Sequence, residues 1–428
     1  MKVKFFTLGC KVNQYESQAM LEALTAQGFQ PASPSEPADV VVVNSCTVTA
    51  QSEQKARQAL RRLKRQNPSA LAVLTGCWPQ AFPQEAAALS EADIVLGTGR
   101  RAALGERILQ YLSNKQRIVD IPPHQKGEAF EPMQVRGLAG HTRAFLKIED
   151  GCERYCSYCI IPFARGRVRS KPLADITAEV MGLAAAGYKE VVLTGINLPA
   201  YGQELGLSLC DAVEAACAVE GMAWVRLGSL EPERLTPPVI ARMQKQEKLC
   251  PQFHLSLQSG CDATLRRMNR HYTAAEYREI VENLRRAFPG CAVTTDIMVG
   301  FPGETEEEFA ASLAFAREIG FAKAHVFAYS RRPGTVADRA PEQVSAGEKE
   351  ARSRRMIEAM EEARQAFFRG QAGEKVPVLF ERMVEPGVYE GHMPNYTPVR
   401  VESGEDISGQ ILWVKLIGAA EEYCTGER

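Results

Sequence analysis

The sequence predicts an α/β protein of three parts: a doubly wound N-terminal sheet domain, a partial (β/α)6 barrel and a small C-terminal β-barrel of the OB-like kind. Three observations lead to this prediction. β-rich runs alternate with helical patterns up to about residue 113, the alternation resumes at residue 144, and short strands with Gly and Pro turns replace it after residue 372. With 428 residues the chain is long enough for each part to bury a core.

The N-terminal domain, residues 1–114, is expected to contain four parallel strands, each followed by a helix. The strands are expected at 3–8, 39–44, 71–75 and 93–96, and the helices at 14–27, 50–66, 79–89 and 101–112. Cys10, Cys46 and Cys77 each lie just past one of the first three strands. Open α/β sheets bind ligands at that edge, so we predict that the three thiols meet there and hold an iron–sulfur cluster. The alternative is that each is a small core residue.

Residues 115–140, rich in Pro, Gly and Gln, are predicted to be a linker. The second domain, 141–371, should form the partial barrel, with its site at the carboxyl ends of the strands. Its strands are expected at 144–148, 190–194, 224–228, 253–257, 293–298 and 324–329, with helices between them. A long charged helix at 342–370 should brace this domain against the last one, 372–428.

The most specific motif follows the first barrel strand, where Cys152, Cys156 and Cys159 have the spacing CxxxCxxC. Across these positions a helix would rise about 10 Å, so the segment is expected to be a loop wrapped around its ligand. Three thiolates bind three irons of a four-iron cube and leave the fourth iron open. A zinc site and inert thiols are the alternatives, but structural zinc takes four ligands, and the nearest other candidate is His141.

Small and polar residues end other strands on the same rim. Glycines there let a ligand approach the backbone closely, so the set is predicted to bind a nucleoside-bearing cofactor, with ordinary turn chemistry as the alternative. The predicted cofactor-binding residues are Thr194, Gly195, Asn197, Gln258, Ser259, Gly300 and Gly303.

Basic residues gather in two places, and both are predicted to contact RNA phosphates. The first is a helix face with Glu53 as its only acidic neighbour in sequence, and the second follows the CxxxCxxC loop. A solvated surface is the alternative for both, and a cofactor carboxylate is a further one for the second. The residues are Arg57, Arg61 and Lys64 in the first place, and Arg165, Arg167 and Arg169 in the second.

Overall charge gives no further support for nucleic-acid binding. The formal net charge is −1, so any such contact must come from local patches. Residues 372–428 hold five Lys and Arg against ten Asp and Glu, which argues against RNA binding by that part. No apolar run approaches 18 residues, and twelve cysteines without an export signal indicate metal ligands or reduced thiols. A cytoplasmic protein without a membrane partner is expected.

Together these features resemble the radical-SAM methylthiotransferases over nearly the whole chain, including a C-terminal TRAM module around residues 391–396. The segments TLGCKVNQYES (7–17) and LTGINL (193–198) resemble the MtaB branch, which acts on threonylcarbamoyladenosine beside the anticodon of tRNA. Glu153, Phe163 and Trp78 depart from the family pattern, but none of these departures removes a cysteine ligand.

The resemblance implies two [4Fe–4S] clusters. One, on Cys152, Cys156 and Cys159, would bind S-adenosyl-L-methionine (SAM) and cleave it to a 5′-deoxyadenosyl radical that takes hydrogen from carbon 2 of the adenine at tRNA position 37. The other, on the N-terminal triad, would supply or deliver sulfur, and a second SAM per turnover would give the methyl group. The implied partners are tRNA, a flavodoxin-like or ferredoxin-like electron donor and a sulfur source.

Three alternatives stay open at this point. The same fold could act on isopentenyladenosine in tRNA or on a ribosomal protein. The chain could be an iron–sulfur RNA-binding protein without turnover, which would not consume SAM. It could also be a structural zinc protein, which metal analysis would reveal.

Overall fold

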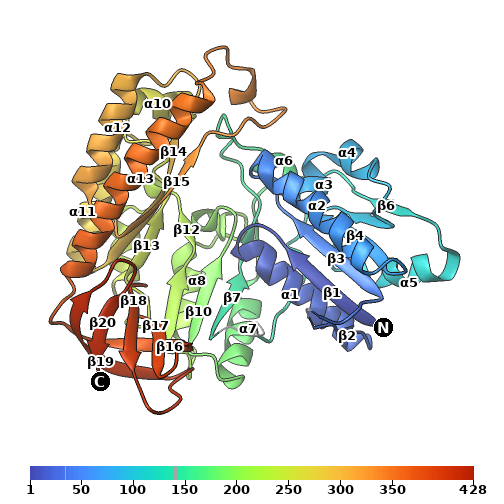
Figure 1. The fold of residues 1–428 in the computed structure, drawn as a ribbon, viewed down its shortest axis with the longest axis horizontal. Coiled ribbons are helices and arrows are strands. Elements are labelled where there is room, and N and C mark those ends of the chain that lie inside the picture. Colours follow the sequence, from blue (N-terminus) through green and yellow to red (C-terminus); the bar gives the residue numbers. More distant parts are fainter. Residues whose placement is uncertain (34, 138–141) are drawn as a thin grey trace.

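The structure is a computed structural model that describes residues 1–33, 35–137 and 142–428, and it confirms the predicted three-part α/β architecture (Figure 1). The N-terminal domain and the partial barrel lie side by side, and the C-terminal barrel sits below the partial barrel in that view. The predicted boundary between linker and barrel, at 140/141, falls outside the described residues.

The N-terminal domain is a six-stranded parallel sheet in the order β2-β1-β3-β4-β5-β6. The strand order reverses at β1, so the β1/β3 boundary is the switch point at which such sheets bind ligands. The strands are β1 (Lys2–Thr7), β2 (Gln30–Pro31), β3 (Val40–Ser45), β4 (Leu71–Gly76), β5 (Ile94–Leu96) and β6 (Ile118–Asp120). The helices are α1 (Lys11–Ala26), α2 (Ala50–Gln66), α3 (Cys77–Ala81), α4 (Pro83–Ala87) and α5 (Leu104–Asn114).

Strand β3 shows why this sheet is buried on both faces. Val40 and Val42 point into one apolar core and Val41 and Val43 into another, because successive side chains of a strand alternate between the faces. Helix α1 covers the first face and α2 the second. The β-branched run is therefore a strand, as predicted, and it lies in the interior of the sheet.

Three details of this domain differ from the sequence prediction. The helix expected at 79–89 is two short helices, because the backbone of Phe82 is not helical (φ −131°, ψ 66°) and Pro83 starts a new helix. Strand β6 lies inside the predicted linker and adds an edge to the sheet. Strand β2, of two residues, was not predicted.

The partial barrel contains all six predicted strands, in two parallel sheets ordered β11-β10-β7 and β12-β13-β14-β15. Gly228 separates β11 from β12, so the chain passes from one sheet into the other at that residue. The strands are β7 (Arg143–Lys147), β10 (Glu190–Thr194), β11 (Trp224–Leu227), β12 (Ser229–Leu230), β13 (Gln252–Leu255), β14 (Ala292–Val299) and β15 (Lys323–Ala328).

Helices cover the outside of this barrel, and several begin with a reciprocal cap. Thr305 and Glu308 cap α12 in this way. The helices are α6 (Ile161–Arg165), α7 (Leu173–Ala185), α8 (Leu209–Cys217), α9 (Pro237–Met243), α10 (Asp262–Arg267), α11 (Ala274–Ala287), α12 (Glu306–Ile319) and α13 (Ala346–Arg369). Short 3-10 turns lie at 198–200, 203–205, 232–234 and 337–339.

The C-terminal part is a closed barrel in the order β16-β17-β18-β20-β19, which confirms the predicted small β-barrel. The strand β20, which was not predicted, closes it by pairing with both β18 and β19. The strands are β16 (Lys375–Glu385), β17 (Val388–His392), β18 (Pro398–Glu402), β19 (Ile411–Ala419) and β20 (Cys424–Glu427).

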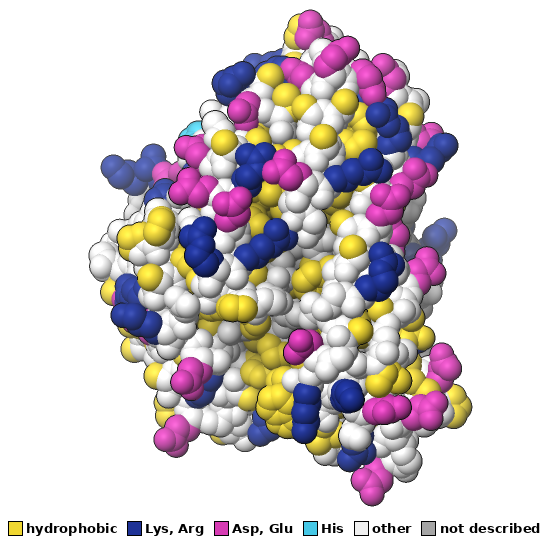
Figure 2. Space-filling view, turned by 90° about the vertical axis from the view of Figure 1, so that its left-hand side faces the viewer, with side chains coloured by type: hydrophobic (Ala, Val, Ile, Leu, Met, Phe, Trp, Pro, Cys, Tyr) yellow, Lys and Arg dark blue, Asp and Glu magenta, His cyan; other side chains and the backbone are white. Residues whose placement is uncertain are grey.

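Helix α13 joins the last two domains, since it packs along β15 and its Phe368 enters the core of the small barrel. The face of the molecule over α11–α13 and the C-terminal barrel carries interspersed basic and acidic side chains (Figure 2). Ion pairs such as Arg317–Glu362 and Arg278–Glu318 lie there. Among the described residues, no helix combines the length and the apolar character that crossing a membrane requires.

Candidate iron–sulfur and cofactor site

The N-terminal triad lies at the carboxyl ends of β1, β3 and β4, the edge at which it was predicted. Cys10 precedes α1, Cys46 follows β3 and Cys77 begins α3 after β4. The Asn13 side-chain amide donates hydrogen bonds to the carbonyls of Leu8 (2.8 Å) and Ser45 (3.1 Å) and so ties the first two loops together. The structure therefore brings three thiols from three strand ends to one edge.

Glycine is required beside these thiols. Gly9 has a φ of 108°, and a Cβ at this position would lie 3.0 Å from Cβ and 3.3 Å from Sγ of Cys46. Any larger residue would both strain the backbone and push the second loop away. Gly9 thus allows the Cys10 and Cys46 loops to approach each other.

N–H groups are directed at the sulfur atoms of this triad. Arg165 Nε donates to Cys77 Sγ at 3.2 Å, and the Val48 amide donates to Cys46 Sγ at 3.5 Å. Burial raises the pKa of the Cys77 thiol to about 12 and also raises that of Cys46. Metal binding must displace these protons, and the donors already present suit a thiolate that ligates iron.

The CxxxCxxC segment is a loop, as its spacing predicts. The short strands β8 (Glu149–Asp150) and β9 (Arg169–Ser170) pair at its base, and the Cys152 amide donates to the Gly166 carbonyl at 3.0 Å. Gly151 has a φ of 95°, and a Cβ there would overlap the Arg167 carbonyl. The loop therefore closes on itself with its three thiols grouped at the carboxyl end of β7.

This second triad has its own arginine. Arg270 Nη1 donates to Cys156 Sγ at 3.4 Å, and the same guanidinium pairs with Glu231 and donates to the Ser256 carbonyl. Burial raises the pKa of Cys159 to about 12 and raises that of Cys152 as well. Each triad thus has one buried arginine that holds one of its sulfurs.

The donor sets fit cubane clusters. Among the described residues there is no compact group of three His, Cys, Asp or Glu side chains suited to a single metal ion. A cubane asks for a wider arrangement, because each thiolate binds a different iron. Each place offers three thiols, and in each an arginine N–H donates to one of the sulfurs.

Three buried acceptors without partners face the rim near Cys152. They are Glu149 Oε1, Asn197 Oδ1 and Gln258 Oε1. The other oxygen of Glu149 accepts from the Asn197 amide at 2.7 Å, and burial raises the pKa of this carboxyl to about 8. Buried acceptors cost free energy unless something donates to them, so a ligand with N–H groups fits this place.

Glu149 escaped the sequence analysis because it looks like an ordinary strand residue before the motif. Two of the predicted contacts, Asn197 and Gln258, supply the other unpartnered oxygens. Gln258 has a φ of 65°, and its own amide and carbonyl bond to β14, so its backbone is fixed. Thr194 and Ser259 are buried on the same rim, and Gly195 lies against Glu149.

Gly300 and Gly303 face a different surface. The Gly300 amide donates to Glu304 (2.7 Å), whose carboxylate pairs with Arg352 of α13 (2.9 Å). A Cβ at Gly300 would collide with Lys349, and one at Gly303 would lie 2.9 Å from Glu342. These contacts favour a packing role, and cofactor binding by the two glycines stays a prediction.

The basic strip after the cluster loop is mostly buried. Arg165 is fully buried and Arg169 is 7% exposed, so neither offers a surface to RNA phosphates. They were predicted as surface residues because a run of alternating arginines in a sequence looks solvated. The Arg167 side chain is 55% exposed and 3.5 Å from Glu153.

The basic face of α2 has acidic partners that its own sequence does not show. Arg57 pairs with Glu85 at 2.6 Å and Arg61 with Glu91 at 2.7 Å, both from the segment around α4, and Lys64 pairs with Asp93 at 3.1 Å. The expectation that this face lacks acidic neighbours is therefore wrong, because its partners come from a neighbouring βα unit. RNA contact by these three residues stays a prediction.

A charged network joins the two domains beneath the cluster loops. Arg165 pairs with Glu16 of α1, and Arg101 pairs with the same carboxylate at 2.5 Å. Lys147 Nζ lies 2.8 Å from Glu16 and 2.6 Å from Asp150. The surrounding cations hold the pKa values of both carboxyls below their usual range. We call these five residues the seam network.

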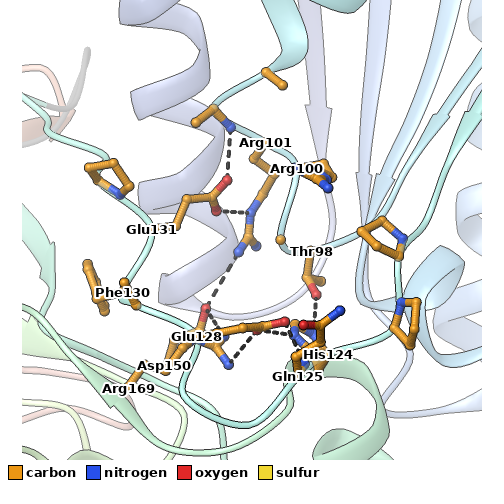
Figure 3. A pocket seen from close by; sticks show the side chains of 17 residues that line it. Thr98, Arg100, Arg101, His124, Gln125, Glu128, Phe130, Glu131, Asp150 and Arg169 are labelled. Carbon is orange, nitrogen blue, oxygen red and sulfur yellow. Dashed lines mark hydrogen bonds and ion pairs between the residues drawn. The ribbon is translucent and has the colours of Figure 1, made fainter.

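A polar cavity of about 470 Å³ opens beside the seam network (Figure 3). Arg101 lies between Glu131 and Asp150, and the Thr98 hydroxyl lies 3.0 Å from His124 Nε2. One wall is the segment 122–132, so part of the predicted linker lies packed in the seam between the domains.

Comparison with known proteins agrees with this arrangement. Residues 2–97 match the uncharacterized protein family UPF0004, and residues 146–316 match the Radical SAM superfamily. Threonylcarbamoyladenosine tRNA methylthiotransferase MtaB of Bacillus subtilis is 37% identical, with 99% of this chain and 96% of that protein covered. The MtaB protein of Thermotoga maritima is also 37% identical, with 98% and 95% covered.

More distant relatives and solved structures extend the likeness. A tRNA-2-methylthio-N(6)-dimethylallyladenosine synthase of Pelotomaculum thermopropionicum is 32% identical, covering 99% of this chain and 97% of its own. The radical S-adenosylmethionine methyltransferase TsrM of Kitasatospora setae has the same fold, with a TM-score of 0.57, 16% identity, and 79% and 77% of the two chains covered. The protein with two cysteine triads at one seam therefore belongs to the radical-SAM methylthiotransferase family, in its MtaB-type branch.

Proposed function

We propose that this enzyme methylthiolates carbon 2 of threonylcarbamoyladenosine at position 37 of tRNA, next to the anticodon. The observation that carries the proposal is the pair of cysteine triads on facing domain edges, linked by Arg165, which follows one cysteine loop and hydrogen-bonds to Cys77 of the other triad. Curated MtaB proteins that are 35–37% identical over nearly the whole chain support the choice of substrate.

Each triad would hold one [4Fe–4S] cluster: Cys152, Cys156 and Cys159 the one that binds SAM, and the N-terminal triad the one that handles sulfur. When bound, the two clusters and two SAM molecules per turnover would supply the radical, the sulfur and the methyl group that an unactivated C–H bond requires. The protein residues position and shield this chemistry.

The roles of individual residues follow from their contacts. Arg165 and Arg270 hold the sulfur ligands by N–H···S hydrogen bonds. The free oxygens of Asn197 and Gln258 would accept hydrogen bonds from the amino or hydroxyl groups of bound SAM, and the protonated carboxyl of Glu149 would donate one to it. The seam network excludes water from the region beneath both loops, because its charged groups are nearly all buried and paired with each other.

The proposed partners follow from this reaction. The adenine must leave its stack in the anticodon loop to enter the site. Electrons would come from an external flavodoxin-like or ferredoxin-like donor, and an external sulfur source would replace the sulfur consumed. We place the reaction in the cytoplasm, where tRNA and reduced thiols are found.

The proposal is tested by separating the two triads. Wild-type protein prepared anaerobically should carry about eight irons, as two four-iron cubes do. Replacing Cys10, Cys46 and Cys77 with Ala should halve the iron and abolish methylthiolated nucleoside, while dithionite still drives release of 5′-deoxyadenosine. Replacing Cys152, Cys156 and Cys159 with Ala should halve the iron and stop that release.

Two results would count against the proposal. Zinc in place of iron would exclude the cluster assignment. Mass spectrometry of tRNA nucleosides showing a methylthio group on isopentenyladenosine rather than threonylcarbamoyladenosine would move the enzyme to the other tRNA branch, whose members are 32–33% identical to this chain.

A further inference from the structure

The inner face of the partial barrel carries charged and polar side chains, in contrast to its apolar outer face. Along β7 and β10, Ala144, Leu146, Val191 and Leu193 pack outward into the core shared with the helices. The residues between them point inward, and the strand register places Arg143 beside Glu190. The other sheet continues this pattern, with His254 beside Thr294 and Asp296 beside His325. The interior of the barrel, called the chamber below, is therefore lined by charged and polar side chains together with apolar ones such as Phe145 and Val192.

The floor of this chamber is made with the C-terminal barrel. Arg226 pairs with Glu190 at 2.6 Å and donates to the Pro394 carbonyl at 2.7 Å. Arg143 pairs with Glu190 and with Glu381 of β16. The Tyr396 ring lies beneath both guanidinium groups, with ring-centroid distances of 4.9 Å to Arg143 and 4.7 Å to Arg226.

One cation reaches this chamber from the other domain. Lys11 directly follows Cys10 and is the first residue of α1, which packs against β7 (Figure 1). Its ammonium group lies 5.9 Å from the centroid of the inward-facing Phe145 ring. Its electrostatic neighbours are Arg143, Arg226 and Glu190 on the chamber floor, together with Cys10.

Lys11 differs from the two arginines because its charge is not balanced. Within 1–33, 35–137 and 142–428, its ammonium group has no hydrogen-bond or ion-pair partner, whereas both arginines are paired. Arg143 and Arg226 are paired with Glu190 and Glu381, so in the described parts of the chain the Lys11 ammonium is left without a carboxylate that balances it. The excess positive charge favours an anionic group of a ligand.

The proposed substrate carries such a group. Its adenine bears a threonine on N6, which ends in a carboxylate, whereas an isopentenyl arm is uncharged. Carbon 2 and carbon 6, which carries the N6 arm, flank the same ring nitrogen, so an adenine held with carbon 2 at the cysteine loops directs its N6 arm into the same region. Lys11 directly follows Cys10, and Arg154, the cation inside the CxxxCxxC loop, is already paired with Glu233.

We propose that Lys11 is a specificity-determining residue that binds the threonine carboxylate of the N6 arm. The paired arginines of the floor add to the positive electrostatic potential at that carboxylate. This inference rests on the proposed function and deepens it, because it names the group of the substrate that the enzyme recognises, the carboxylate of the N6 arm. The arm enters the chamber, and its carboxylate supplies the partner that the Lys11 ammonium lacks. An uncharged arm would leave that ammonium without a counter-charge.

The test measures binding of anticodon stem-loop RNAs by anaerobically prepared, cluster-loaded enzyme. One RNA carries threonylcarbamoyladenosine, and the second carries its threonine amide, which has the same shape without the charge. A charge-assisted hydrogen bond gives a roughly tenfold or larger preference, so the wild type should prefer the acid by that factor. Lys11→Met should bind both RNAs equally, and Lys11→Arg should keep most of the preference.

Lys55→Met is the matched control, because Lys55 is an exposed lysine on α2 of the same domain. It should discriminate as the wild type does. A Lys11→Met enzyme that still prefers the acid tenfold overturns the inference, and so does a wild type that binds the acid and the amide equally, whether or not the variant folds. If the wild type forms product while Lys11→Met keeps the preference, only the inference fails; if the wild type forms no product, the proposed function fails and takes the inference with it.

Discussion

Arg165 shows how much one side chain contributes to the seam. It is fully buried. Its guanidinium donates a hydrogen bond to Cys77 and forms ion pairs with Glu16 and Asp150. Arg165→Met would leave the two carboxylates without one of their cations, and breaking a buried pair in this way costs about 3–5 kcal/mol. Urea unfolding of the anaerobic protein should show a loss of that size.

Arg167→Met is the control for this variant, since its side chain is exposed and its ion pair with Glu153 is long. Exposed pairs contribute little, so its free energy of unfolding should stay within about 0.5 kcal/mol of the wild type. Equal losses in the two variants would show that the seam network is not a stabilising unit.

Glu149 gives stability a pH dependence that the sequence does not suggest. Burial raises its pKa in the folded protein to about 8, above the ordinary value of 4.5. Between these values the folded state keeps a proton that the unfolded chain has lost, so this group's contribution is greatest below pH 4.5 and is lost as pH rises to about 8. The slope is about 1.4 kcal/mol per pH unit.

Glu149→Gln should remove this dependence. In metal-free protein, its free energy of unfolding relative to the wild type should rise steadily from pH 5 to pH 8, as denaturant titrations at several pH values would show. Glu153→Gln changes an exposed position of the same loop. Its free energy of unfolding should depend on pH as that of the wild type does. A Glu149→Gln curve that is also parallel would mean that the carboxyl is ionised in the folded protein.

At the scale of elements, the loop between β17 and β18 closes the bottom of the partial barrel. Tyr396 stacks on His392 at 4.6 Å and lies against two arginines of the barrel strands. Tyr396→Ala should cost about 2–4 kcal/mol through lost burial and cation–π contacts. Trp413→Ala, at a 60% exposed position of the same small barrel, should cost much less in the same thermal or urea unfolding experiment.

That loop lies within the segment that resembles the TRAM module, so its structure bears on RNA binding. Met393, Asn395 and Thr397 are buried, and the Asn395 amide donates to the Gly290 carbonyl of the partial barrel. Deleting residues 372–428 would therefore expose the chamber floor as well as remove a domain. Loss of RNA binding in such a deletion would not by itself identify an RNA contact.

The long elements could be predicted from the sequence, while the short ones could not. The β-branched run of β3 predicts a strand by itself, because it is buried on both faces. Strands β2, β6 and β20 have two to four residues and are half exposed. These short strands form because a neighbouring strand has free backbone N–H and C=O groups to pair with. That neighbour is distant in sequence, so the local residue pattern does not reveal it.

The same distinction applies to the site. The six cysteines could be predicted because each follows a recognisable strand or motif. The seam network could not, because its five residues come from four separate segments of the chain and only Lys147 and Asp150 are neighbours in sequence. A charge looks solvated in a sequence until its partner from another element is known.

At the scale of the whole molecule, the paired charges on α2 bear on how tRNA binds. If RNA contacts this face, its phosphates compete with Glu85 and Glu91 for Arg57 and Arg61. Replacing both glutamates with Gln should then tighten tRNA binding and steepen the plot of log affinity against log salt by roughly one to two units. Titration of labelled tRNA at several salt concentrations measures both quantities.

Glu306→Gln is the control, because Glu306 pairs with Arg355 on the face over α12 and α13. It should leave the affinity and the slope as they are. If the double Gln variant also behaves as the wild type does, tRNA does not contact the α2 face, and the predicted role of Arg57, Arg61 and Lys64 would be wrong.

The seam network also decides how this protein can be recombined with its relatives. A chimera joined anywhere between residues 114 and 141 would separate Glu16 and Arg101 from Lys147, Asp150 and Arg165. Five buried charges would then meet foreign partners, even though the junction itself lies between two matched families. A working exchange of the N-terminal domain must therefore include the complementary residues of β7, β8 and α6. The unit that can be exchanged is the domain together with its interface, and not a continuous stretch of chain.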